Sequence, residues 1–140
     1  MMFVLDTNVV SELRKVRLGK ADVNVAAWTL CVDAADLFVS AITIMELELG
    51  VLSIERNDAT QGAMLRSWLE QQVLPEFSGR TLPVDTAVAG RCARLQTPDE
   101  RGERDALIAA TALDALWHEL GFDGAPWSMG CWITARLKVF

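Results

Sequence analysis

The chain has 140 residues, of which 51% are hydrophobic and 23% are charged, and its formal net charge is −6. This length fits a single domain, and the composition is that of a globular protein, which excludes a wholly disordered chain. The acidic balance argues against nonspecific binding to duplex DNA, although it still permits a nucleic-acid substrate because divalent cations can offset carboxylates at a site.

The cysteines and the hydropathy of the sequence indicate the cellular compartment of the protein. Cys31, Cys92 and Cys131 are scattered and form no CxxC spacing, so we expect reduced thiols and neither disulfides nor a zinc site. The sequence shows no signal-peptide pattern, and no apolar run reaches the roughly 18 residues of a membrane span. These features predict a cytoplasmic protein without a membrane segment.

Strand and helix patterns alternate along the first half of the chain. The apolar run MFVL predicts a buried strand, and Thr7 or Asn8 is placed to cap the helix after it. The elements expected next are a weak helix over 21–33, a strand over 36–43 and a helix over 43–55.

The second half continues the alternation. Its expected elements are an amphipathic helix over 59–77 stopped by Pro75, a short strand over 80–84, a helix over 86–96 capped by Asp85, a polar loop over 97–103 and a helix over 104–120. Strands that alternate with helices predict an α/β fold with a parallel sheet.

The predicted order of strands and helices places three acidic residues at one edge of the sheet. Asp6 ends the first strand, Glu46 lies early in the helix after the second strand, and Asp105 opens the long helix. Ligands of open parallel sheets gather outside the carboxyl ends of the strands. A few carboxylates with open coordination positions suit Mg²⁺ or Mn²⁺ and phosphate chemistry.

Each acid also has a purely structural interpretation. Asp6 is a suitable helix cap, and Thr43 with Glu46 fits the S/T-x-x-E capping box, in which the glutamate bonds to the backbone. Asp105 would stabilise the dipole at the start of its helix.

Four segments carry a family resemblance in order and spacing. FVLDTNVVSEL, VSAITIMELELGV, LPVD and RDALIAATAL resemble the PIN-domain ribonuclease toxins of bacterial toxin–antitoxin pairs, the VapC-like proteins, and lean toward their FitB-like branch. The resemblance covers residues 2 to about 113 and implies a Rossmann-like α/β/α fold with a Mg²⁺- or Mn²⁺-dependent endoribonuclease site. It places the catalytic acids on Asp6, Glu46 and Asp105, with Asp6 and Asp105 as metal ligands.

The resemblance also assigns neighbouring polar residues. Thr7 and Asn8 match the family's DTN motif and are expected to hold the first carboxylate or the substrate, and Ser40 and Thr43 border the same edge. Asp85 matches the LPVD position, but we interpret it as a helix cap.

Residues 114–140 depart from the family, although we treat 1–140 as one PIN domain. No TRN or TRD motif follows IAATAL, and Asp123, 18 residues beyond Asp105, is assigned as a fourth catalytic acid on spacing alone. Either a reading-frame change or genuine divergence accounts for this tail. We expect the helix from Arg104 to end near Leu120.

The resemblance implies a toxin that hydrolyses RNA with a metal-activated water. Its partners would be a cognate antitoxin, through which alone it would contact operator DNA, and further copies of itself as a homodimer or larger assembly. The alternative is a catalytically impaired PIN domain that acts mainly as the antitoxin-binding partner in a DNA-binding autorepressor complex.

Overall fold

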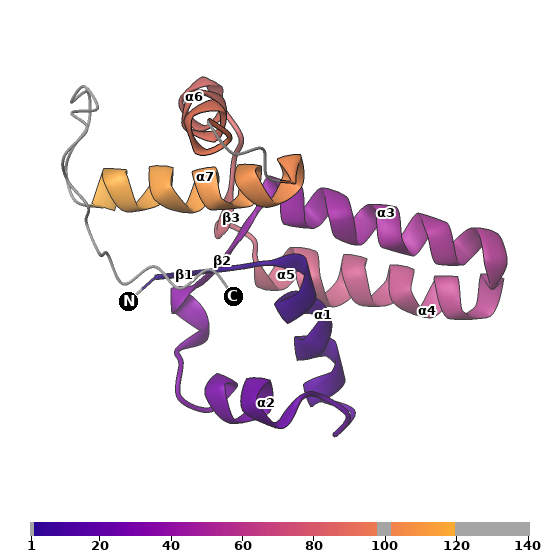
Figure 1. Ribbon diagram of the computed structural model, residues 1–140. Coiled ribbons are helices and arrows are strands. Elements are labelled where there is room, and N and C mark those ends of the chain that lie inside the picture. Colours follow the sequence, from indigo (N-terminus) through magenta and orange to yellow (C-terminus); the bar gives the residue numbers. More distant parts are fainter. Residues whose placement is uncertain (1, 98–101, 120–140) are drawn as a thin grey trace.

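A small parallel sheet lies at the centre of the computed structural model, with helices around it (Figure 1). The structure describes residues 2–97 and 102–119. The strands of this part are β1 (Phe3–Leu5), β2 (Leu37–Ser40) and β3 (Thr81–Leu82), in the order β1-β2-β3 with both pairings parallel. The α/β class and the parallel sheet expected from the sequence are therefore confirmed.

Helices make up most of the remaining described chain. They are α1 (Thr7–Val16), α2 (Val23–Thr29), the 3₁₀ turn η1 (Ala34–Asp36), α3 (Ala41–Asn57), α4 (Ala59–Trp68), the π-helical turn η2 (Leu69–Val73), α5 (Leu74–Glu76), α6 (Thr86–Leu95) and α7 (Glu103–Glu119). In the part of the chain that the structure describes, no helix is both long and apolar enough to cross a membrane.

The core forms around the strands because their side chains are apolar on both faces. Val4, Leu5 and Val39 are completely buried, as expected for parallel strands covered on both sides. One hydrophobic cluster joins β1 and β2 to α1, α3, η2 and Phe77 after α5, and a second one packs α6 against α7. The strand ends are thereby held between helices.

Several element bounds differ from the sequence expectation, and two of the differences have a clear physical reason. The second strand ends at Ser40 and α3 begins at Ala41, two residues before the expected start at Thr43. The helix expected over 59–77 is interrupted by η2, in which Leu74 N–H donates to the Leu69 carbonyl. Pro75 follows directly, and a proline ring clashes with the carbonyl four residues earlier, so a locally wider turn accommodates it.

The last described helix agrees with the expectation. It covers Glu103–Glu119, against an expected 104–120. Of the divergent tail, residues 114–119 belong to this helix, whereas Asp123 and the rest of 120–140 lie outside the described residues.

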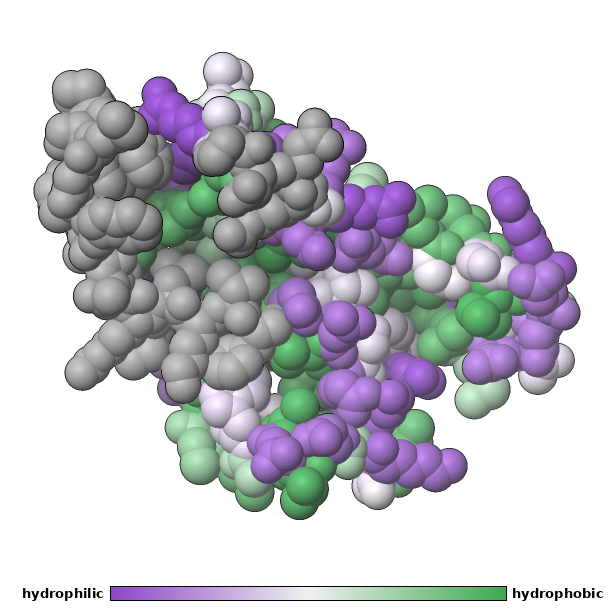
Figure 2. Space-filling view, viewed as in Figure 1, coloured by the Kyte–Doolittle hydropathy of each residue, from purple (hydrophilic) through white to green (hydrophobic). Residues whose placement is uncertain are grey.

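Helices α3 and α4 form a long antiparallel hairpin to one side of the sheet (Figure 1). Figure 2 shows hydrophilic residues over its outer end. Arg66 of α4 binds Glu55 of α3 at 3.0 Å and Glu48 at 2.5 Å. The hydrogen bond between the two side chains lowers the pKa of Glu55 and raises the pKa of Arg66. Both groups are therefore charged near neutral pH.

The closest approach of the hairpin is at Gly62. A Cβ atom placed there would lie 2.6 Å from Glu55 Cα, whereas a Cβ on Gly50 of α3 would meet nothing within 4 Å. We expect Gly62→Ala to lower the free energy of unfolding by about 1–3 kcal/mol, because the backbones must separate. Gly50→Ala, the matched control, should raise it by about 0.5–1 kcal/mol through helix propensity. Urea denaturation measures both, and equal effects of the two substitutions would contradict the close approach.

Candidate active site at the carboxyl end of the sheet

Asp6 occupies the junction between β1 and α1. It is the N-cap of α1, where its Oδ1 accepts a hydrogen bond of 2.9 Å from the Val9 N–H. Its side chain is half-buried at the end of a fully buried strand. The capping interpretation is therefore confirmed, and a cap at this place also fixes one carboxylate at the edge where parallel sheets bind ligands.

Glu46 is the point at which three elements meet. It lies in the second turn of α3, and its Oε2 accepts a hydrogen bond from Thr7 Oγ1 at the start of α1. On its other side, Arg104 Nη1 of α7 lies 3.9 Å from Glu46 Oε1. Since Thr7 follows Asp6 and Arg104 precedes Asp105, these two contacts bring the elements that carry all three acids to one edge.

The capping box that was the structural alternative for Thr43 and Glu46 is wrong. The N-cap of α3 is Ser40, whose Oγ accepts a 3.2 Å bond from Ile42 N–H. Thr43 is completely buried, and its Oγ1 donates to the Leu5 carbonyl at 3.3 Å. The hydrogen bonds of Ser40 and Thr43 thus fix the ends of β2 and β1. The Glu46 carboxylate does not bond to the backbone as in a capping box, and accepts its hydrogen bond from Thr7.

The other expected site residues occupy more exposed positions. Asp105 is exposed in the first turn of α7, where a Cβ on Gly102 would lie 3.4 Å from its Oδ2. Asn8 is also exposed. Asp85 caps α6 by accepting a 2.9 Å bond from Val88 N–H, which confirms its interpretation as a cap.

The acidic side chains of this edge can be compared with the ligands that a divalent cation needs. Within residues 2–97 and 102–119, no group of three Asp, Glu, His or Cys side chains is placed to hold a metal ion. The three-acid centre therefore stays a prediction. Mg²⁺ commonly binds proteins through only one or two carboxylates and completes its shell with water and substrate phosphates. Asp6, Glu46 and Asp105 are all carboxylates, so the type of donor fits that mode.

A buried ion pair beside the second core was not expected from the sequence. Arg91 Nε of α6 lies 2.6 Å from Asp114 Oδ1 of α7, and both side chains are buried. His118 Nε2 lies 3.4 Å from the other Asp114 oxygen. The only signal in the sequence is a lone aspartate in the apolar run TALDAL, four residues before His118. This cluster joins α6 to α7 and is separate from the three acids.

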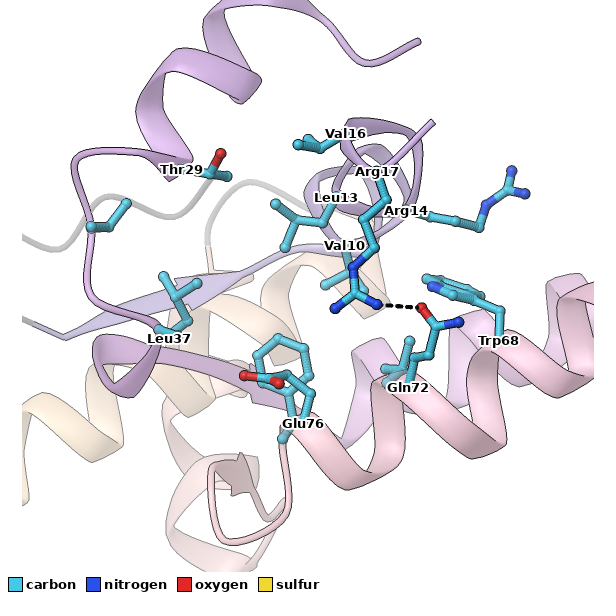
Figure 3. A pocket seen from close by; sticks show the side chains of 14 residues that line it. Val10, Leu13, Arg14, Val16, Arg17, Thr29, Leu37, Trp68, Gln72 and Glu76 are labelled. Atoms are coloured by element: carbon cyan, nitrogen blue, oxygen red, sulfur yellow. Dashed lines mark hydrogen bonds between the residues drawn. The ribbon is translucent and has the colours of Figure 1, made fainter. Parts of the chain in front are cut away.

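A cavity of about 360 Å³ lies between α1 and the segment from α4 to α5 (Figure 3). Its walls are largely apolar, with Arg17 donating a 3.0 Å bond to Gln72 and the Arg14 guanidinium 5.8 Å from the centre of the Trp68 ring. None of the three acids lines it.

Comparison with known proteins places this architecture in a family. Residues 3–117 match the family model of the PIN domain. The chain belongs to the PIN domain family. The matched span contains Asp6, Glu46 and Asp105, so the family resemblance of the sequence motifs is confirmed.

Individual PIN relatives support the assignment. Ribonuclease VapC14 of Mycobacterium tuberculosis (strain CDC 1551 / Oshkosh) is 49% identical over 77 residues, which are 55% of this chain and 72% of that protein. Toxin FitB of Neisseria gonorrhoeae (strain ATCC 700825 / FA 1090) is 37% identical over 116 residues, which cover 79% and 80% of the two chains.

Solved structures agree with this PIN fold. The crystal structure of FitAcB from Neisseria gonorrhoeae aligns with a TM-score of 0.72 at 36% identity, over 82% of this chain and 83% of that chain. The structure of FitAB bound to an IR36 DNA fragment gives 0.71 at 34% identity, over 81% and 80% of the two chains.

The two roles of Asp6 can be separated by substitution. Asparagine accepts the Val9 N–H bond as aspartate does, so we expect Asp6→Asn to leave the free energy of unfolding of the metal-free protein equal or slightly higher. Asp6→Ala removes the cap and should cost about 1 kcal/mol. Urea denaturation in EDTA measures both. A loss in Asp6→Asn as large as that in Asp6→Ala would show that the structure depends on the charge itself.

Proposed function

We propose that this chain is a Mg²⁺- or Mn²⁺-dependent endoribonuclease and the toxin of a toxin–antitoxin pair. The observation that carries the proposal is the pair of contacts at Glu46, to Thr7 and to Arg104, which draws the acid-bearing ends of β1, α3 and α7 together. The names of the relatives point the same way, since one is a ribonuclease and another a toxin.

The residues at this edge have distinct tasks in the proposal. Asp6 and Asp105 would hold the cation, and the Thr7 hydroxyl orients the Glu46 carboxylate by donating to its Oε2. The cap bond to Val9 N–H keeps the Asp6 side chain against the start of α1. A divalent cation bound there supplies a water of lowered pKa and stabilises negative charge on a phosphate. The attacking group is water, so no nucleophilic side chain is required.

The proposed partners follow from chemistry and from the solved relatives. RNA is the substrate, and a cognate antitoxin is the protein partner, since FitA accompanies FitB in the related complex on DNA. A chain with net charge −6 is poorly suited to bind operator DNA itself, so the antitoxin would supply that contact. We propose a cytoplasmic homodimer or larger assembly.

Two observations favour a second candidate. No three-ligand group is present in the described ranges, and the sequence after IAATAL lacks the family's TRN or TRD motif. The chain would then be a catalytically impaired PIN domain that serves chiefly to bind the antitoxin in an autorepressor complex.

Cleavage of RNA by the purified full chain distinguishes the two. We expect cleavage that requires Mg²⁺ or Mn²⁺, stops in EDTA, and falls by about 100-fold or more in Asp6→Asn, because a metal contributes several kcal/mol to such reactions. Asp85→Asn is the matched control, since Asp85 caps α6 as Asp6 caps α1.

The control variant should keep full activity. Cleavage that persists in EDTA or in Asp6→Asn would contradict the proposed site. An inactive chain that still binds its antitoxin tightly would establish the impaired alternative.

A further inference from the structure

Arg104 is a positively charged side chain next to the proposed site. It lies in the first turn of α7, directly before Asp105, and its Nη1 reaches across to Glu46 Oε1 at 3.9 Å. The Arg104 side chain is 56% exposed, whereas that of Glu46 is 20% exposed. In this ion pair, Arg104 is therefore open to solvent, whereas Glu46 is part of the proposed site.

We propose that Arg104 is the counter-ion of Glu46 in the metal-free protein, that a divalent cation displaces it, and that the displaced guanidinium binds a phosphate of the RNA. The inference rests on the proposed function and assigns to Arg104 a substrate-binding role in it.

Displacement follows from how the two oxygens of Glu46 are used. Oε2 accepts the Thr7 hydroxyl, and Oε1 faces Arg104. A cation held at this edge would draw on Oε1 and would repel the guanidinium beside it. A pair at 3.9 Å with a half-exposed arginine contributes little to stability, so breaking it costs little.

Transfer of Arg104 to a phosphate follows from charge. The chain carries a net charge of −6, and three acids lie on the elements that meet at this edge, so an approaching polyanion meets repulsion unless a cationic group lies close by. A guanidinium presents planar, paired donors that match phosphate oxygens. Arg66 and Arg91, by comparison, are held in ion pairs between helices.

Calorimetric titration of the full chain with MgCl₂ tests the displacement. We expect Arg104→Gln to bind Mg²⁺ about three- to ten-fold more tightly than the wild type, because a competing charge is gone. Arg56→Gln, in the exposed last turn of α3, makes the same change in net charge and should leave the affinity unchanged. Unchanged or weaker binding by Arg104→Gln, or equal effects of both variants, would overturn the proposal.

Fluorescence anisotropy with a single-stranded RNA oligonucleotide tests the phosphate contact. In the otherwise unsubstituted chain at saturating MgCl₂, with anisotropy read before any cleavage accumulates, Arg104→Gln should weaken binding and reduce the slope of log affinity against log salt by about 0.7, the value of one phosphate contact. Arg104→Lys should keep most of the slope, and Arg56→Gln all of it. An unchanged slope in Arg104→Gln would overturn the contact.

Neither measurement depends on cleavage. Both expected results in a chain that cuts no RNA would therefore leave Arg104 as proposed and reject only the ribonuclease activity.

Discussion

The parallel pairing of β1 with β2 is the constraint on which the rest of the site depends. Leu5 pairs with Val39, so both strands end at the same edge, and the residues that follow them begin α1 and α3 side by side. The buried Thr43 hydroxyl then bonds to the Leu5 carbonyl, and the Thr7 hydroxyl bonds to Glu46. Thr43 thus ties α3 to the end of β1, and Thr7 ties α1 to α3. Without this register, the helix starts that carry Asp6 and Glu46 would not lie at the same edge of the sheet.

The arginines show how the same side chain serves different purposes. Arg66 joins α3 to α4 through two glutamates, and Arg91 is buried against Asp114 between α6 and α7. Breaking a buried pair of this kind leaves an uncompensated charge and is costly. Arg104 has one long, exposed contact, and it is this weakness that lets the proposed exchange of partners occur.

Local chemistry made much of this structure predictable. The continuous apolar run before Asp6 predicted a buried strand, and Asp85 before a helical pattern predicted a cap, because both signals lie within a few residues. The start of α3 was misplaced because Ser40 and Thr43 are both acceptable caps by residue type. Only burial distinguishes them, since Thr43 turns inward to β1 while Ser40 caps.

Contacts between residues far apart in the sequence could not be predicted from local sequence patterns. The motifs suggested that Asp6, Glu46 and Asp105 share one edge, but neither the Thr7–Glu46 bond nor the Arg104–Glu46 pair could be inferred from spacing. The Arg91–Asp114 pair joins residues 23 apart and depends on how α6 packs on α7. Such contacts are fixed by tertiary packing, which periodicity does not encode.

The central claim is that acids from β1, α3 and α7 make one cation site at the carboxyl end of the sheet. Anomalous diffraction from a crystal of the full chain soaked in Mn²⁺ tests it most directly. The account predicts a peak about 2.1 Å from a carboxylate oxygen of Asp6, with Glu46 and Asp105 around the same ion or its waters. A peak elsewhere on the molecule, or none at saturating Mn²⁺, would contradict it.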